Sequence, residues 1–318
     1  MTLPAALGSR LAIPAIVAPM FLVSGPDLVV ACCKAGLLGT FPTLNQRTSD
    51  GFAQWLDEVE TRLADTPTAA PFGVNLIVHK SNPRVSADLD LIVAHRVPLV
   101  ITSLGAVPDI IDAVHSYGGI VLHDVIGVRH AEKALAAGAD GLIAVAAGAG
   151  GHAGTLSPFA LIAEIRSFFD GPLALSGAIT QGSHVAAARI MGADLAYIGS
   201  RFIASDESMA SPEQKAMMVD AKAADIVYTD KVSGVSANFL GPSLAAATLP
   251  DGHGGLSLND EARAWKTVWS AGHGVGATRS VEPAQAICDQ LIREYAAATP
   301  GGWDDRTTYH KLREDRPL

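Results

Sequence analysis

The chain is poor in cysteine and in positive charge. Its 318 residues include three cysteines, and 23 lysines and arginines against 32 acidic residues give a net charge of −9. This surplus of negative charge argues against nucleic acids and anionic membranes as partners. Cys32 and Cys33 are adjacent and Cys288 lies far away, a pattern that favours free thiols over a disulfide framework. We therefore expect a soluble protein of the reducing cytoplasm.

Other common signatures are missing as well. No apolar run approaches the roughly 18 residues that a membrane span needs, and no charged leader with an apolar core opens the chain. We expect neither export nor a membrane span. The metal-binding patterns H-x-x-E-H and C-x-x-C are absent, so we predict no metal site. No G-x-G-x-x-G follows the first predicted strand, which disfavours a dinucleotide-binding sheet.

Apolar residues are abundant, at 49% of the chain against 17% charged residues, which fits a sheet covered on both faces. Short apolar runs alternate with amphipathic segments. The predicted strands are Ile13–Ala18, Leu37–Phe41, Phe72–Val78, Leu99–Ser103, Ile120–Val125, Gly141–Ala146, Leu173–Ser176 and Leu195–Gly199. The predicted helices between them are Pro26–Ala35, Phe52–Leu63, Ala87–Arg96, Pro108–Tyr117, Val128–Ala137, Pro158–Phe169 and Ser183–Met191.

Short strands that are each followed by a helix predict an α/β protein with a parallel sheet. Eight such strands predict a closed (β/α)8 TIM barrel, with an open doubly wound sheet as the alternative. Several predicted helices end in a glycine just before the next strand, as expected of C-terminal caps. These glycines are Gly36, Gly118, Gly138 and Gly192.

The pattern changes after the eighth strand. Residues 206–278 contain one helical run, Pro212–Ala224, followed by chain rich in glycine, serine, proline and asparagine. This composition predicts a small insertion of helix and loop that serves as a lid or substrate segment. The barrel would comprise residues 1–205 and 279–318, with its last helix at Pro283–Ala297. We expect the polar tail Thr299–Leu318 to lie on the surface or to form a homodimer contact.

A histidine in a stretch nearly free of side chains is the most informative local feature. His152 lies in the segment Gly148–Gly154, directly after the sixth predicted strand. Glycines let the backbone approach a flat ligand closely, and an imidazole exchanges protons near neutral pH. We interpret His152 as a catalytic residue. A flexible loop whose histidine faces solvent is the alternative.

Small and polar residues follow other strands, and the carboxyl ends of barrel strands form the active face. Ser176-Gly177-Ala178 and Gly199-Ser200 follow the seventh and eighth strands, where backbone N–H groups and helix starts can hold a phosphate. Ordinary turns are the alternative. Asn75 is a polar group within a buried strand and needs a partner. Asp124 alternates with His123, so we expect His123 to point to the other face of the sheet.

Five motifs occur in the same order as in the nitronate monooxygenases. They are Ala18-Pro19-Met20, Phe72-Gly-Val-Asn75-Leu, the His152 loop, Ser176-Gly-Ala178 and Gly199-Ser-Arg-Phe202. The chain resembles this family of FMN-binding barrels from about Ile13 to Ala297, and Trp269-Ser-Ala-Gly272 resembles its closing segment. The wider flavin group with these motifs includes NADH:quinone reductases and FMN-dependent enoyl-acyl-carrier-protein reductases. Relatives often have lysine where this chain has Asp124.

The resemblance implies FMN as the cofactor and His152 as the catalytic histidine. The phosphate would lie at the loops after the seventh and eighth strands, and the isoalloxazine against Met20 and Asn75. From its place at the end of an apolar strand, rather than from the resemblance, we expect Asp124 to accept a hydrogen bond from a ribityl hydroxyl. The implied cofactor-binding residues are Ala18, Pro19, Met20, Asn75, Asp124, Gly150, Gly151, Ser176, Gly177, Ala178, Gly199 and Ser200, and the substrate pocket would include Ser270 and Asn238.

The leading hypothesis for the reaction is oxidation of an alkyl nitronate with O2 to a carbonyl compound and nitrite. FMN would carry the electron chemistry, and His152 would hold the nitronate oxygens or take the α-proton of a neutral nitroalkane. An FMN-dependent NAD(P)H:quinone or enoyl-thioester reductase is the alternative. A non-flavin barrel that binds a phosphorylated metabolite is a third interpretation, which the colour of the purified protein would test.

Overall fold

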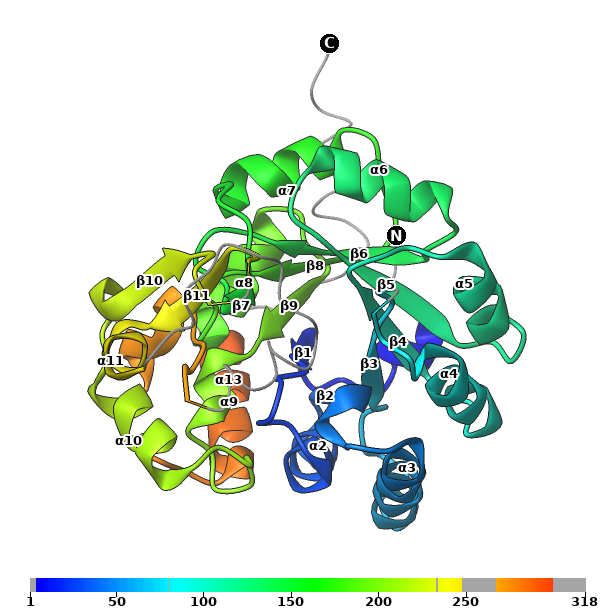
Figure 1. The fold of residues 1–318 in the computed structure, drawn as a ribbon, viewed down its shortest axis with the longest axis horizontal. Coiled ribbons are helices and arrows are strands. Elements are labelled where there is room, and N and C mark those ends of the chain that lie inside the picture. Colours follow the sequence, from blue (N-terminus) through cyan, green and yellow to red (C-terminus); the bar gives the residue numbers. More distant parts are fainter. Residues whose placement is uncertain (1–3, 80, 233, 248–266, 300–318) are drawn as a thin grey trace.

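The computed structural model describes residues 4–79, 81–232, 234–247 and 267–299. Eight of its strands form a closed parallel barrel, in the order β1-β2-β3-β4-β5-β6-β8-β9 (Figure 1). β1 pairs with β9, so that Ile16 lies opposite Tyr197, and this pairing closes the sheet. The predicted (β/α)8 barrel is therefore confirmed, and the alternative of an open doubly wound sheet is wrong.

Every predicted barrel strand is present, with ends that differ by two residues at most. The barrel strands are β1 (Ala15–Val17), β2 (Leu38–Pro42), β3 (Gly73–Ile77), β4 (Leu99–Ser103), β5 (Ile120–Val125), β6 (Gly141–Val145), β8 (Leu173–Ser176) and β9 (Leu195–Ile198). The helices are α1 (Ala5–Gly8), α2 (Pro26–Lys34), α3 (Ser49–Ala64), α4 (Val85–Ala94), α5 (Pro108–His115), α6 (Val128–Ala136), α7 (Pro158–Arg166), α8 (Gly182–Ile190), α9 (Ser200–Ile203), α10 (Pro212–Asp220), α11 (Gly241–Ala246) and α13 (Ala284–Ala298), with 3-10 turns η1 (Thr43–Asn45), η2 (Ala223–Asp225) and η3 (His273–Ala277).

Two buried apolar layers explain the high apolar content. Side chains of alternate strand positions, such as Ile16 and Ile143, pack together inside the barrel, and Leu7 of α1 joins them. The positions between them, such as Val17 and Val100, pack against the surrounding helices. Because both faces of each strand are covered, the strands are apolar almost throughout.

The glycines predicted to end helices have the backbone conformation of a C-terminal cap. Gly36, Gly118, Gly138 and Gly192 have φ values of +87°, +84°, +101° and +109°. This left-handed region strains residues with a side chain but not glycine. The prediction from the glycine spacing is confirmed.

The three cysteines are buried free thiols, as predicted. Cys288 of α13 lies beside Cys32 of α2, at the contact between these two helices. Burial raises the pKa of the Cys33 thiol to about 12, so this thiol stays protonated and unreactive at neutral pH.

The chain between β9 and α13 forms a substructure beside the barrel (Figure 1). It contains strands β10 (Ile226–Thr229) and β11 (Ala237–Leu240), which form a small sheet with β7 (Gly151–His152). The sequence predicted helix and loop here and missed these strands. Their partners lie far away along the chain, and the glycine and serine residues around them are typical of loops. The domain boundary at 206–278 stays a prediction, and residues 248–266 and 300–318 lie outside the described residues.

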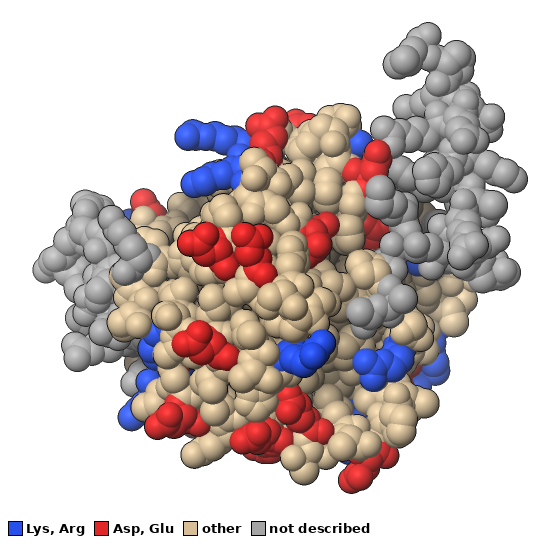
Figure 2. All heavy atoms as spheres, turned by 90° about the vertical axis from the view of Figure 1, so that its right-hand side faces the viewer, with Lys and Arg blue, Asp and Glu red and all other residues tan. Residues whose placement is uncertain are grey.

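Charged side chains of both signs are interspersed on the side of the barrel that Figure 2 shows. Uncharged residues occupy most of the described surface between them. This face offers no continuous basic surface among its described residues. None of the described helices has the length and hydropathy required to cross a bilayer.

We predict that Gly182→Ala lowers the free energy of unfolding by about 1–3 kcal/mol, because one helix must shift. Gly182 begins α8 and donates its N–H to Glu294 Oε2 of α13 (2.8 Å). A Cβ there would collide with the backbone oxygen of Leu291 and the backbone nitrogen of Tyr295. Chemical denaturation measures the effect. As a control, Ser183→Ala at the exposed neighbouring position should change the free energy of unfolding by less than about 0.5 kcal/mol. If Gly182→Ala were as stable as the parent protein, this close packing of α8 against α13 would be contradicted.

Candidate functional site

The carboxyl ends of the barrel strands surround a cavity of about 580 Å³. Every residue predicted for the site except Asn238 lines this cavity. Ser103 of β4, Tyr197 of β9 and Gln214 of α10 line it too and were not among the predicted site residues. Alternation along β9 could have indicated Tyr197, because it shares the inner face with Leu195. No local signal marks Gln214.

The loops after β8 and β9 present small residues to the cavity. Gly177 and Ala178 have φ values of +147° and +53°. Positive φ strains Ala178 but not glycine, and strained residues cluster at ligand sites. A Cβ built on Gly199 would come no closer than 3.5 Å to Ala18 and Met20. The protein's own packing therefore does not require glycine at position 199, whereas a ligand that occupies the adjoining cavity would.

The helix starts behind these loops differ from each other. α9 begins at Ser200, directly after Gly199, but it is a single turn. α8 begins at Gly182, and its first N–H is already bonded to Glu294. The first N–H of α8 is therefore unavailable to an anion, and support of both loops by a helix start stays a prediction.

A chain of hydrogen bonds crosses three neighbouring strands at the cavity. Asn75 Nδ2 donates to the backbone oxygen of Ile101 (3.1 Å) and to Ser103 Oγ (2.7 Å). Ser103 Oγ donates to Asp124 Oδ2 (2.6 Å). The buried amide of Asn75 thus has the partners that its position requires.

Asp124 ends this chain with one oxygen unused. Its Oδ1 is shielded from solvent and has no hydrogen-bond partner among the described residues. Burial raises the pKa of Asp124 to about 6, although the Ser103 hydrogen bond and the nearby His152 oppose the shift. The carboxyl group therefore changes its charge close to neutral pH.

His123 points away from Asp124, as the alternation predicts. Its Nδ1 lies 2.7 Å from Thr102 Oγ1, on the face of the sheet that α6 covers. Burial lowers the pKa of His123 to about 4, helped by His130 and Lys133. The ring is therefore neutral at neutral pH.

The His152 segment is held in place rather than free. Gly151 and His152 form β7, which pairs antiparallel with Asn238 and Ala237 of β11. The Asn238 amide donates to the backbone oxygen of Ala149 (2.6 Å). These bonds contradict the alternative of a flexible loop, and they place Asn238 behind the loop, where it supports the backbone.

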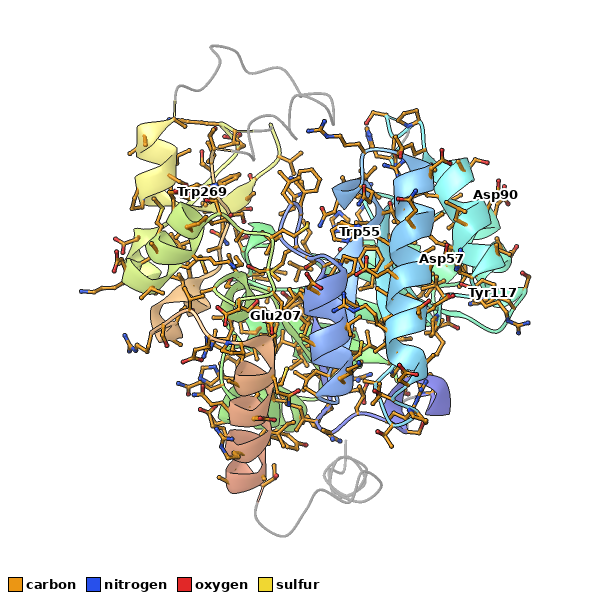
Figure 3. All side chains as sticks on the ribbon, turned by 90° about the horizontal axis from the view of Figure 1, so that it is seen from below. Trp55, Asp57, Asp90, Tyr117, Glu207 and Trp269 are labelled. Carbon is orange, nitrogen blue, oxygen red and sulfur yellow. The ribbon has the colours of Figure 1, made fainter. Side chains whose placement is uncertain are left out.

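Ser270 also holds the His152 segment in place through hydrogen bonds. Its Oγ accepts a hydrogen bond from Gly151 N (2.6 Å) and donates one to Asn238 O (2.7 Å). Gly272 N donates to Ser200 Oγ (2.8 Å), so the chain that follows Trp269 also reaches the loop after β9. Figure 3 shows Trp269 within the insertion. The insertion thus fixes the position of the His152 backbone.

We predict that Ser270→Ala makes the amide of Gly151 exchange about fivefold faster, because a hydrogen bond worth about 1 kcal/mol is lost. Hydrogen exchange of the peptide 148–154 measures this change. Ser167→Ala removes an exposed hydroxyl that bonds to Glu164 O at the end of α7 and should leave exchange unchanged. Equal protection in Ser270→Ala and the parent protein would contradict the role given to Ser270.

One group of potential metal ligands occurs among the described residues, away from the cavity. Asp57 and Glu60 of α3 and His95 at the end of α4 each place one ligand atom within 4.8 Å of the others. Asp57 is labelled in Figure 3 on the outside of the barrel. None of the three lines the cavity, so this group lies apart from the candidate site.

Known proteins that resemble the chain include nitronate oxidising enzymes. The sequence profile described as nitronate monooxygenase matches residues 82–244, just over half of the chain. A nitronate monooxygenase from Paraburkholderia phytofirmans is 25% identical over 343 residues, which cover 88% of this chain and 92% of that protein. An indene-carboxyl-CoA dehydrogenase from Rhodococcus jostii is 26% identical over 233 residues, 73% of this chain and 63% of the relative.

Coverage of the relatives varies. The matches span 63%, 41% and 61% of the length of three curated relatives, the Rhodococcus dehydrogenase among them. Among solved structures, nitroalkane oxidase from Streptomyces ansochromogenes superposes with a TM-score of 0.78 at 25% identity, covering 92% of this chain and 98% of that one. With a profile match to just over half of its length, the chain belongs to the nitronate monooxygenase family.

Proposed function

We propose that this protein is an FMN-dependent monooxygenase that oxidises alkyl nitronates with O2 to carbonyl compounds and nitrite. The observation that carries the proposal is one cavity that is lined both by His152 and by the small-residue loops after β8 and β9. An imidazole and two loops that could hold a phosphate thus line the same cavity. The similarity to a nitronate monooxygenase and to a nitroalkane oxidase supports this reaction.

The residues of the cavity fit FMN. Gly177, Ala178 and Gly199 would surround the phosphate, since a side chain at position 199 would project into the cavity. Met20 and Asn75 would lie against the isoalloxazine. When bound, FMN supplies the electron chemistry of the reaction.

His152 would act on the substrate. Its ring lies on a backbone that β11 and Ser270 hold, so the imidazole is pre-positioned at the cavity. With a nitronate it donates a hydrogen bond to a nitronate oxygen. With a neutral nitroalkane it takes the α-proton as general base.

The cover of the cavity suits short aliphatic substrates. Val235 and Trp269 of the insertion line the cavity together with Ile203, and apolar walls of this kind exclude water and enclose alkyl groups. We further propose a cytoplasmic location, because buried free thiols suit a reducing compartment. A homodimer contact through residues 299–318 stays a prediction.

A reductase or dehydrogenase that acts on a thioester is the second candidate. The Rhodococcus relative is a carboxyl-CoA dehydrogenase, and the cavity reaches His130 and Lys133 of α6, which would attract an anionic substrate. Anaerobic mixing separates the two candidates. Rapid bleaching of bound flavin by an alkyl nitronate supports the monooxygenase, and rapid bleaching by NADH without it supports the reductase.

We predict that Gly199→Asp and Gly177→Asp each abolish retention of FMN, because a carboxylate would occupy and repel the phosphate position. The flavin content of the purified proteins, read from the absorbance near 450 nm that is general for flavins, measures this loss. Gly118→Asp is a control for strain in Gly177→Asp, since both glycines have positive φ and Gly118 has open space around it. Full flavin content in either loop variant would refute the phosphate assignment.

We predict that His152→Ala retains FMN but lowers turnover by about 10²- to 10⁴-fold, the usual effect of losing a positioned acid–base group. The loss should be larger for neutral nitroalkanes than for preformed nitronates, because only nitroalkanes need proton abstraction. Steady-state kinetics on matched nitroalkane and nitronate pairs measure the difference. If turnover of the nitroalkane and of the nitronate fell by the same small factor, His152 would not be a catalytic residue.

A further inference from the structure

The inner face of the barrel is polar on one side of the cavity. Asn75, Ser103 and Asp124 occupy the ends of the adjacent strands β3, β4 and β5, and they line the cavity together. Across the barrel from them, Tyr197 lies on β9. Asp124 is the last residue of this hydrogen-bonded chain, and it has no role in the proposed reaction.

The donors of this chain have a fixed direction. Asn75 uses both protons of its amide nitrogen, one on Ile101 O and one on Ser103 Oγ. Ser103 then directs its single hydroxyl proton to Asp124 Oδ2. Because Oδ2 already accepts a hydrogen bond, a proton carried by Asp124 belongs on Oδ1. That atom is shielded and has no partner among the described residues.

Few charges face the Asp124 carboxyl group. His152 of β7 approaches it, and the phenol of Tyr197, whose own pKa is raised by burial and by Asp124, is neutral at neutral pH. β3 and β4 contribute the uncharged Asn75 and Ser103. His123 on the same strand points to the opposite face, toward His130 and Lys133 of α6, and all three also line the cavity. No arginine among the described residues lines the cavity, so no guanidinium compensates a negative charge at this position.

We propose that Asp124 positions the flavin ring as a neutral carboxylic acid, with its proton on Oδ1 donated to an acceptor atom of the bound isoalloxazine. This inference rests on the proposed function, since it assumes that FMN occupies the cavity. Asp124 can thus donate this hydrogen bond only while its carboxyl group is protonated. Ionisation removes its proton and leaves a buried negative charge beside an acceptor, so binding of FMN weakens as Asp124 ionises.

The test compares FMN binding to apoprotein of the parent chain and of Asp124→Asn between pH 5 and pH 8. The asparagine variant keeps a donor that does not ionise. The ratio of the parent Kd to the variant Kd cancels the titration of the FMN phosphate. With the pKa of Asp124 near 6, we expect this ratio to rise roughly tenfold from pH 6 to pH 8, the worth of one hydrogen bond.

Ser103→Ala is the matched second variant. It removes the hydrogen bond that stabilises the ionised carboxyl group, so the rise in Kd should move to higher pH. A purely structural role of Asp124 would give a ratio that does not depend on pH. Circular dichroism establishes that each variant is folded.

Three outcomes would overturn the inference. A ratio that falls with rising pH would mean that an ionised Asp124 accepts a hydrogen bond from the ring, and a flat ratio would mean that Asp124 does not contact it. Either result leaves the proposed function intact, because FMN still binds. Failure of FMN to bind the parent protein at any pH would overturn the proposed function and this inference with it.

Discussion

The site depends on the backbone hydrogen bonds that close the barrel between its first and last strands. Ala18 N donates to Ile198 O and Ala196 N donates to Pro14 O, and each donor–acceptor distance is 2.9 Å. Closure brings the turn after β1 against the loop after β9, so that Met20 lies beside Gly199. In an open sheet these segments would lie at opposite edges. A ring-binding region and a phosphate-binding region would then not share one cavity.

The barrel could be predicted from the sequence because its signals are local. Each strand is a short apolar run, and a glycine with positive φ marks the end of several helices, as at Gly138 and Gly192. The candidate site followed from the same reasoning. Once strand order and direction are known, residues such as Asn75 and Gly177 must meet at the carboxyl ends of the strands.

The insertion could not be predicted in the same way, because its structure depends on distant partners. β7 consists of two residues, Gly151 and His152, that become a strand through Ala237 and Asn238. Nothing near Asn238 in the sequence indicates that its amide bonds to Ala149 O. The direction of the hydrogen bonds from Asn75 to Asp124 is likewise a property of three strands together. Both features, the small sheet of β7, β10 and β11 and the hydrogen-bonded chain, depend on bonds between residues that are far apart in the sequence.

The neighbours His123 and Asp124 have opposed effects on the acid stability of the fold. Folding lowers the pKa of His123 from 6.5 to about 4 and raises that of Asp124 from 3.8 to about 6. Between these values, unfolding binds a proton at His123 and releases one from Asp124. Stability therefore rises with pH through the first group and falls through the second, by about 3 kcal/mol each. The contributions of these two groups to the pH dependence of unfolding thus nearly cancel between about pH 4 and 6. Replacing either residue would leave the contribution of the other uncompensated.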